Sequence, residues 1–177
     1  MRNALIAATL LLSATAVSAQ QKASGANPAA AGIMQVYTGA RDNIIKAAEQ
    51  VPEDKYSYKP TAAVRSFGAI VAHIADAQNN VCAAAVGNVK PYSDQTEKTA
   101  KTKAAIVAAL KASFAACDRA YSGATDATLA NATTVFGSPS SISHALVLNA
   151  SHSWEHYGNL VTYMRMLGMT PPSSQGQ

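Results

Sequence analysis

The side chains best suited to chemistry in this sequence are its four histidines, His73, His144, His152 and His156. His152 and His156 are four residues apart, a spacing that places both rings on one face of a helix. His73 lies in a separate apolar segment, so three imidazoles from two helices could bind one ion and leave positions open for water or substrate, as in catalytic metal sites. His144 precedes His152 by about 12 Å of helix and is left out. The alternative is that these histidines are core residues satisfied by hydrogen bonds.

Two carboxylates lie beside the candidate ligands. Asp76 follows His73 by about one helical turn, and Glu155 directly precedes His156. Metal-bound histidines usually donate their second ring nitrogen to a carboxylate or carbonyl, and a nearby carboxylate can also move a proton. Asp76 and Glu155 are therefore the candidate catalytic residues, with solvated surface carboxylates as the alternative.

Four segments with helical spacing of apolar residues must position these groups. They are predicted at residues 31–51, 66–86, 97–121 and 140–167. Ser66 suits a helix N-cap, and Gly87 and Gly168 suit helix ends. No segment shows the alternation of a strand. The expected fold class is all-α, a four-helix bundle with His73 on the second helix and the His152/His156 pair on the fourth.

Composition limits the possible functions. The chain has 177 residues, of which 49% are hydrophobic and 14% charged, with Lys+Arg 14 against Asp+Glu 10. A disordered chain would have low hydrophobicity and high charge. A nucleic-acid partner is not expected, because the lysines are scattered rather than gathered into a basic stripe.

The first 19 residues have the pattern of a secretory signal. One arginine precedes an apolar run that ends in Val17-Ser18-Ala19, and the run is shorter than the roughly 20 residues that span a membrane. We expect cleavage after Ala19, a periplasmic or secreted protein, and no membrane span after cleavage. A flexible lead-in is expected at residues 20–30, the bundle at 31–170 and a disordered tail at 171–177.

Two groups of motifs resemble the DinB-like family. The first comprises YSYKP at residues 56–60, VRSFG at 64–68 and VAHIAD at 71–76, and the second is HSWEHYGNL at 152–160. The resemblance extends from about Ala31 to Pro172. It implies a bundle with an up-down-down-up course, a long connection after the second helix, and a divalent ion held by His73, His152 and His156. The family's common His-Arg-Gly-Gln is replaced here by His156-Tyr157-Gly158-Asn159, which changes the surroundings of the ligands.

The two cysteines, Cys82 and Cys117, are expected to oxidise in an exported protein. If the second and third helices were antiparallel, these residues would lie roughly 15 Å apart, beyond the reach of a disulfide. The parallel arrangement that the resemblance implies places both near the same end of their helices, where a disulfide is feasible.

The resemblance leads to two hypotheses of function. The first is a metal-dependent enzyme in which the ion activates water, as in a hydrolase, or a thiol, as in a transferase; export favours water, because the thiols that the family uses are cytoplasmic. The second is a non-catalytic metal-binding or stress-related helical interaction protein. Zinc or nickel is the expected ion, with iron or manganese as alternatives. The substrate would be a small molecule, and a homodimer is left open.

Overall fold

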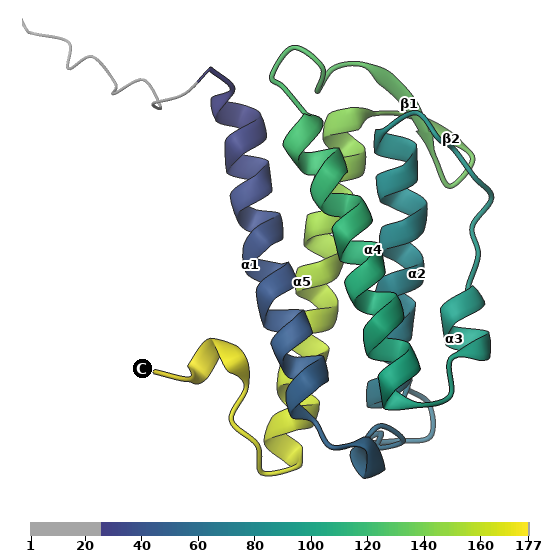
Figure 1. Cartoon of the computed structure of the whole chain (residues 1–177), viewed down its shortest axis with the longest axis vertical. Coiled ribbons are helices and arrows are strands. Elements are labelled where there is room, and N and C mark those ends of the chain that lie inside the picture. The colour runs from purple at the N-terminus through teal and green to yellow at the C-terminus, as the bar shows by residue number, and fades with distance from the viewer. Residues whose placement is uncertain (1–25, 177) are drawn as a thin grey trace, which may run out of the picture.

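Four long helices form most of the computed structural model, which describes residues 26–176 (Figure 1). The predicted signal segment lies outside the described residues, as does most of the lead-in. The helices are α1 (Pro28–Gln50), α2 (Phe67–Ala85), α4 (Lys103–Gly123) and α5 (Ile142–Met166). Three of them begin within three residues of the predicted positions, and the mostly helical fold class is confirmed.

The four helices form a bundle in which α1 and α2 lie diagonally opposite each other. Each of these two helices packs against both α4 and α5. In Figure 1, α2 and α4 run upward, whereas α1 and α5 run downward. Two consecutive parallel helices require a connection that returns along the bundle, and residues 86–102 provide it. This connection contains the short helix α3 (Gln95–Thr99).

The predicted helix caps are confirmed. The Ser66 hydroxyl accepts a hydrogen bond from the backbone N–H of Ala69, at 3.3 Å. Ser141 caps α5 in the same way, accepting from His144 N at 3.2 Å. Gly87 and Gly168 end α2 and α5 with φ of 76° and 73°, a left-handed conformation that glycine adopts without a steric penalty.

The predicted third helix is divided in two. α3 ends at Thr99, and α4 begins at Lys103 with Thr102 as its N-cap, whose hydroxyl accepts from Ala105 N at 3.2 Å. The apolar positions that predicted this helix begin at Val107, so they could not locate the break. The break turns α3 away from α4 and lays it against α2.

A small hairpin lies in the connection between α4 and α5, where no strand is predicted. Strands β1 (Ala132–Val135) and β2 (Ser138–Ser141) pair antiparallel, with Val135 opposite Ser138. Phe136 and Gly137 form the turn with φ of 49° and 82°, the left-handed pair that a tight hairpin requires. The strands have four residues each and are mostly polar, so they carry no alternating pattern.

Regular structure extends into both segments that flank the predicted bundle in the sequence. α1 begins at Pro28, within the expected lead-in, and the Asp126 carboxylate accepts from its free N–H groups at Ala29 and Ala30. Where a disordered tail is predicted, residues 172–174 form a 3-10 turn, η2. The Tyr157 hydroxyl anchors this turn through the side chain and backbone N–H of Ser173, at 2.9 and 3.0 Å.

The core is built from aliphatic and aromatic side chains of all four long helices. Its largest fully buried side chains include Tyr37, Ile44, Phe67, Ile74, Leu110, Phe114, Leu146, Leu160 and Met164. A disulfide joins Cys82 of α2 to Cys117 of α4, with the Cα atoms 5.2 Å apart. The disulfide requires the two cysteines to lie at the same level along the bundle axis. They do so because α2 and α4 are parallel and each cysteine lies near the C-terminal end of its helix.

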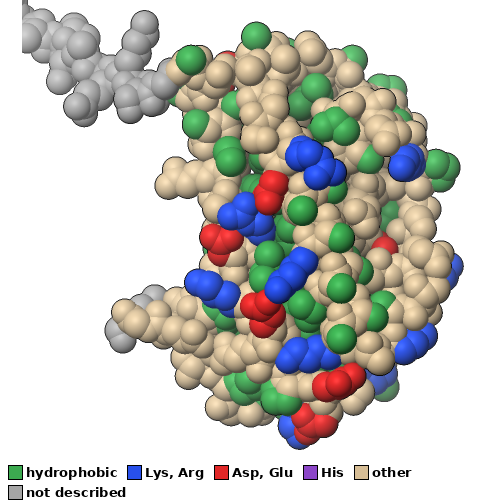
Figure 2. All heavy atoms as spheres, in the orientation of Figure 1, with side chains coloured by type: hydrophobic (Ala, Val, Ile, Leu, Met, Phe, Trp, Pro, Cys, Tyr) green, Lys and Arg blue, Asp and Glu red, His purple; other side chains and the backbone are tan. Residues whose placement is uncertain are grey.

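The described surface mixes charges of both signs. On the face shown in Figure 2, Lys and Arg side chains alternate with Asp and Glu, and no histidine is visible there. Ion pairs among the described residues include Arg41–Asp118 and Lys111–Glu49. Within residues 26–176, no helix is both long and apolar enough to cross a membrane.

Candidate metal centre

Three of the four histidines converge, as the sequence predicts. His73 comes from α2, and His152 and His156 come from adjacent turns of α5, which packs against α2. The Nε2 atom of His152 lies 3.2 Å from Nε2 of His73 and 3.0 Å from Nε2 of His156. One nitrogen from each of the three rings lies within 4.8 Å of the others. His144 is exposed at the start of α5, 2.7 Å from Ser140 Oγ, and takes no part in the cluster.

Two of the nitrogen separations, His73–His152 and His152–His156, fit ligands of one divalent ion. Two imidazole nitrogens that bind one ion at roughly 2.0–2.1 Å lie about 2.9–3.4 Å apart in octahedral or tetrahedral geometry. Hydrogen bonds alone satisfy this cluster poorly, because a ring nitrogen offers either one proton or one lone pair. An ion at the point of convergence would accept a lone pair from each ring. The three histidines could therefore hold a metal ion.

Burial keeps these rings neutral, the form that binds metal. Desolvation lowers the pKa of His73, and the positive charge of Arg65 lowers it further. Desolvation also lowers the pKa of His152, and it lowers that of His156 to about 3, with a contribution from its histidine neighbours. At neutral pH the three lone pairs are available without first removing a proton.

The second ring nitrogens face polar groups that the sequence did not single out as partners. His73 Nδ1 lies 3.4 Å from the Tyr92 hydroxyl and 3.8 Å from Oε2 of Glu97. His156 Nδ1 lies 3.3 Å from the side-chain amide of Asn159. Such groups orient metal-binding rings, and an acceptor such as the Glu97 carboxylate favours a proton on Nδ1 of His73, which leaves Nε2 free. Asn159 thus lies beside a ligand even though it is shorter than the glutamine common in the family.

Asp76 is buried and binds the backbone of α3. Its two carboxylate oxygens accept hydrogen bonds from the N–H groups of Thr96 and Glu97, both at 2.9 Å. Only 3% of Asp76 is exposed, so both bonds are shielded from water. The predicted catalytic role of Asp76 stays a prediction. The contacts favour a positioning role, in which Asp76 holds α3 so that Glu97 faces His73.

Glu155 lies at the exposed edge of the cluster. Its carboxylate makes no hydrogen bond or ion pair with residues 26–176, and its charge raises the pKa of His73 and His152 against the larger effect of burial. It is close enough to influence the rings but is not one of the three converging ligands. Its catalytic role also stays a prediction.

Replacing Asp76 with asparagine is expected to destabilise the fold and release α3. A neutral amide cannot accept two charge-assisted hydrogen bonds, and each such bond contributes about 1.5–3 kcal/mol. We expect the free energy of unfolding in urea to fall by at least about 1.5 kcal/mol and amide exchange to accelerate in residues 94–99. Asp42→Asn is the matched control, because Asp42 is an exposed aspartate of α1 that pairs with Arg41. Unchanged stability and exchange in Asp76→Asn would contradict the positioning role.

An open pocket of about 650 Å³ lies beside the cluster. It is bordered by the loop before α2, by α3 and by α5, and its lining includes Val64, Arg65, Ile70, Glu97, His156, Asn159 and Tyr163. His156 belongs both to the cluster and to the pocket wall. A small molecule in the pocket would therefore contact a ligand residue of the candidate metal centre.

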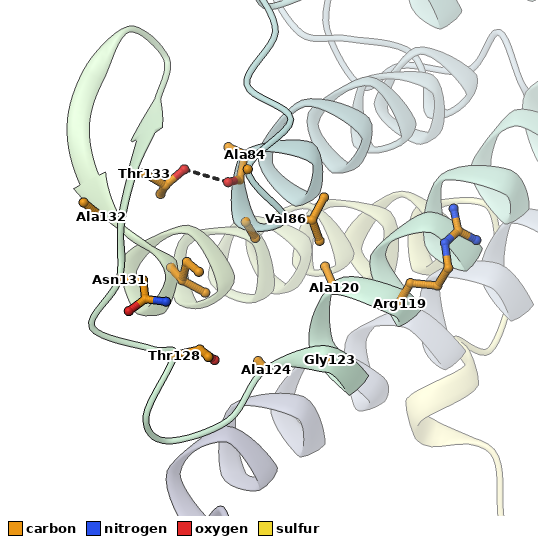
Figure 3. A pocket seen from close by; sticks show the side chains of 13 residues that line it. Ala84, Val86, Arg119, Ala120, Gly123, Ala124, Thr128, Asn131, Ala132 and Thr133 are labelled. Carbon is orange, nitrogen blue, oxygen red and sulfur yellow. Dashed lines mark hydrogen bonds between the residues drawn. The ribbon is translucent and has the colours of Figure 1, made fainter.

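A second cavity, of about 400 Å³, lies near the hairpin (Figure 3). Small side chains at the ends of α2 and α4 line most of it, and Thr133 donates to the carbonyl of Ala84 at 2.6 Å. Arg119 is its one charged lining residue. Its lining contains no histidine, cysteine or carboxylate, so this cavity offers no group for metal binding or acid–base chemistry.

Glu97, Arg65 and Tyr92 are the site residues that sequence reasoning missed. Glu97 was placed at the start of a long helix, where nothing linked it to His73. The pattern of Asp94 followed three residues later by Glu97 is typical of a helix N-terminus near residue 95, but it does not mark the break after Thr99. No comparable signal identifies Tyr92, because its contact with His73 depends on how the connection folds back.

The fold and the site define a helical-bundle protein with a three-histidine cluster able to hold a metal ion. The sequence model that defines the DinB superfamily matches residues 37–160 of this chain. The chain therefore belongs to the DinB superfamily, and the resemblance seen in its motifs is confirmed. No curated protein matches the sequence.

Solved structures show the same fold. A DinB-like protein from Bacillus cereus superposes with a TM-score of 0.68 at 20% identity, covering 80% of this chain and 95% of that chain. A DinB-like protein from Bacillus subtilis has a TM-score of 0.64 at 23% identity, covering 82% and 99% of the two chains. At these identities the likeness concerns the fold alone.

Proposed function

We propose that this chain is an exported, metal-dependent enzyme whose divalent ion, zinc or nickel, is held by His73, His152 and His156. The observation that carries the proposal is the convergence of three neutral imidazoles beside an open pocket, with His156 in the pocket wall. A structural metal site is closed by four protein ligands, whereas a site with three ligands leaves room for a reactant. When bound, the ion would lower the pKa of a water or thiol ligand and so supply a nucleophile.

The residues around the cluster divide the remaining tasks. Glu97 and Asn159 orient the rings of His73 and His156. Glu155 is exposed and lies within electrostatic range, and it would accept a proton from the nucleophile. We propose hydrolysis rather than thiol transfer, because the thiols used in the superfamily are cytoplasmic.

Export is proposed on two grounds. Residues 1–19 have the sequence pattern of a secretory signal, and the two cysteines are paired in a disulfide. Disulfides persist in oxidising compartments and are rare in the cytosol. We therefore propose a periplasmic or secreted protein that begins at Gln20.

One observation favours a second function, non-catalytic metal binding. Asp76, one of the two candidate acids, uses both of its oxygens to hold α3. Glu155 is then the only one of the two with a carboxylate left to move a proton. If Glu155 does not act, the ion would be bound without turnover.

The test is turnover by the protein loaded with zinc or nickel. We expect hydrolysis within a panel of small carboxylic esters and amides, and a loss of at least about 100-fold in kcat/KM in His152→Ala, because the ion that supplies the nucleophile is lost. His144→Ala should match the wild type, since His144 lies outside the cluster. Stoichiometric metal binding with no turnover on the ester, amide or thiol-transfer panels would favour the non-catalytic function.

A further inference from the structure

The guanidinium of Arg65 lies in the wall of the 650 Å³ pocket beside the histidine cluster, and most of its N–H donors have no acceptor among residues 26–176. Its Nε donates to Oε1 of Glu97 at 3.0 Å. Among residues 26–176 this is the only acceptor that the guanidinium meets by hydrogen bond or ion pair. An arginine side chain has five N–H donors, so the two terminal nitrogens keep four for a ligand.

The backbone beneath Arg65 is held firmly. The carbonyl of Arg65 accepts a hydrogen bond from the Tyr163 hydroxyl at 3.0 Å, and Ser66 caps α2 immediately afterwards. Phe67 N also donates to the carbonyl of Tyr58, at 2.8 Å. The loop is therefore tied to α5 and to the preceding segment. The pairing with Glu97 further restrains the guanidinium and leaves its terminal edge unpaired.

The rest of the pocket combines apolar surface with the candidate metal centre. Val64 is 42% exposed, and Ile70 and Tyr163 border the same space. The terminal edge of a guanidinium matches the two oxygens of a carboxylate, whereas a lysine offers only a point charge. Glu97 already neutralises part of the charge of Arg65, so the preferred ligand carries one carboxylate rather than several.

We propose that the pocket binds a small molecule with an apolar body and a carboxylate, and that the terminal N–H groups of Arg65 pair with that carboxylate. This inference rests on the proposed function and deepens it by naming the class of substrate. The carboxylate lies at the Arg65 side of the pocket. The bond to be hydrolysed then lies on the side of His156.

Benzoate and benzamide are the probes, because they have nearly the same shape and differ in charge. We expect benzoate to bind the zinc-loaded protein at least about tenfold more tightly than benzamide in calorimetric titrations. Arg65→Gln should weaken benzoate binding about 10- to 100-fold and leave benzamide unchanged. Arg65→Lys keeps the positive charge but lacks the paired N–H groups of the guanidinium, so its loss of benzoate affinity should be smaller than that of Arg65→Gln. Arg119→Gln is the control, because Arg119 lines the other cavity.

The same titration on His152→Ala separates this inference from the proposed function. We expect that variant, which lacks the metal centre, to bind benzoate more weakly but still in an Arg65-dependent way, with NMR shifts confined to residues 63–70 and 156–163. Equal binding of benzoate and benzamide, or benzoate binding unaffected in both folded Arg65 variants, would overturn the carboxylate subsite. Failure of the proposed function would show instead as missing metal or missing turnover, with the Arg65-dependent binding intact.

Discussion

His152→Ala is expected to abolish metal binding, the largest single effect that this structure predicts. Wild-type protein loaded with zinc or nickel and passed through a desalting column should retain about one ion per chain, and the variant close to none. His152 is the central histidine of the cluster, because its Nε2 lies within 3.2 Å of both partner nitrogens. Loss of a group that only orients a ligand costs 10- to 100-fold in affinity, and we expect the loss of this ligand to exceed about 100-fold.

The controls for this prediction come from the same helix. His144→Ala removes an exposed imidazole of α5 and should leave the metal content unchanged. Metal should also raise the free energy of unfolding of the wild type, by about 4 kcal/mol when free metal is 1,000 times its Kd. Equal metal content in the two folded variants, or no metal in the wild type after loading, would contradict a three-histidine centre.

The second large effect concerns the disulfide between Cys82 and Cys117. It closes a loop with a sequence separation of 35, and a cross-link of this length stabilises a fold by roughly 3–4 kcal/mol, mainly by restricting the unfolded chain. We expect Cys82→Ala/Cys117→Ala to lower the free energy of unfolding in guanidinium by about that amount. Metal content should stay near that of the wild type, because neither cysteine belongs to the histidine cluster.

Redox and export controls complete this test. Dithiothreitol should destabilise the wild type but not the double variant, which has no disulfide to reduce. Protein recovered from the periplasm should begin at Gln20 and should lack free thiols by mass spectrometry. Free thiols in that protein, or identical unfolding of the two proteins in oxidising buffer, would contradict a stabilising disulfide.

The sequence by itself determined the helices and the candidate ligands. Apolar residues at helical spacing predicted α1, α2 and α5, and caps such as Ser66 and Gly168 placed their ends within a few residues. These signals are local, because capping and burial of one helix face depend on residues a few positions apart. The four-residue spacing of His152 and His156 is local in the same sense, and the family motif supported the inclusion of His73.

Tertiary structure alone decided what surrounds the ligands. The meeting of Glu97 with His73, the use of Asp76 to hold α3, and the position of Arg65 in the pocket wall each join segments that lie far apart in the sequence. The break between α3 and α4 was not predicted, because the apolar positions that indicated the third helix begin only at Val107. Such contacts depend on how the connection after α2 folds back against the bundle. That path is set by long-range packing and by the buried charge of Asp76, which no local pattern records.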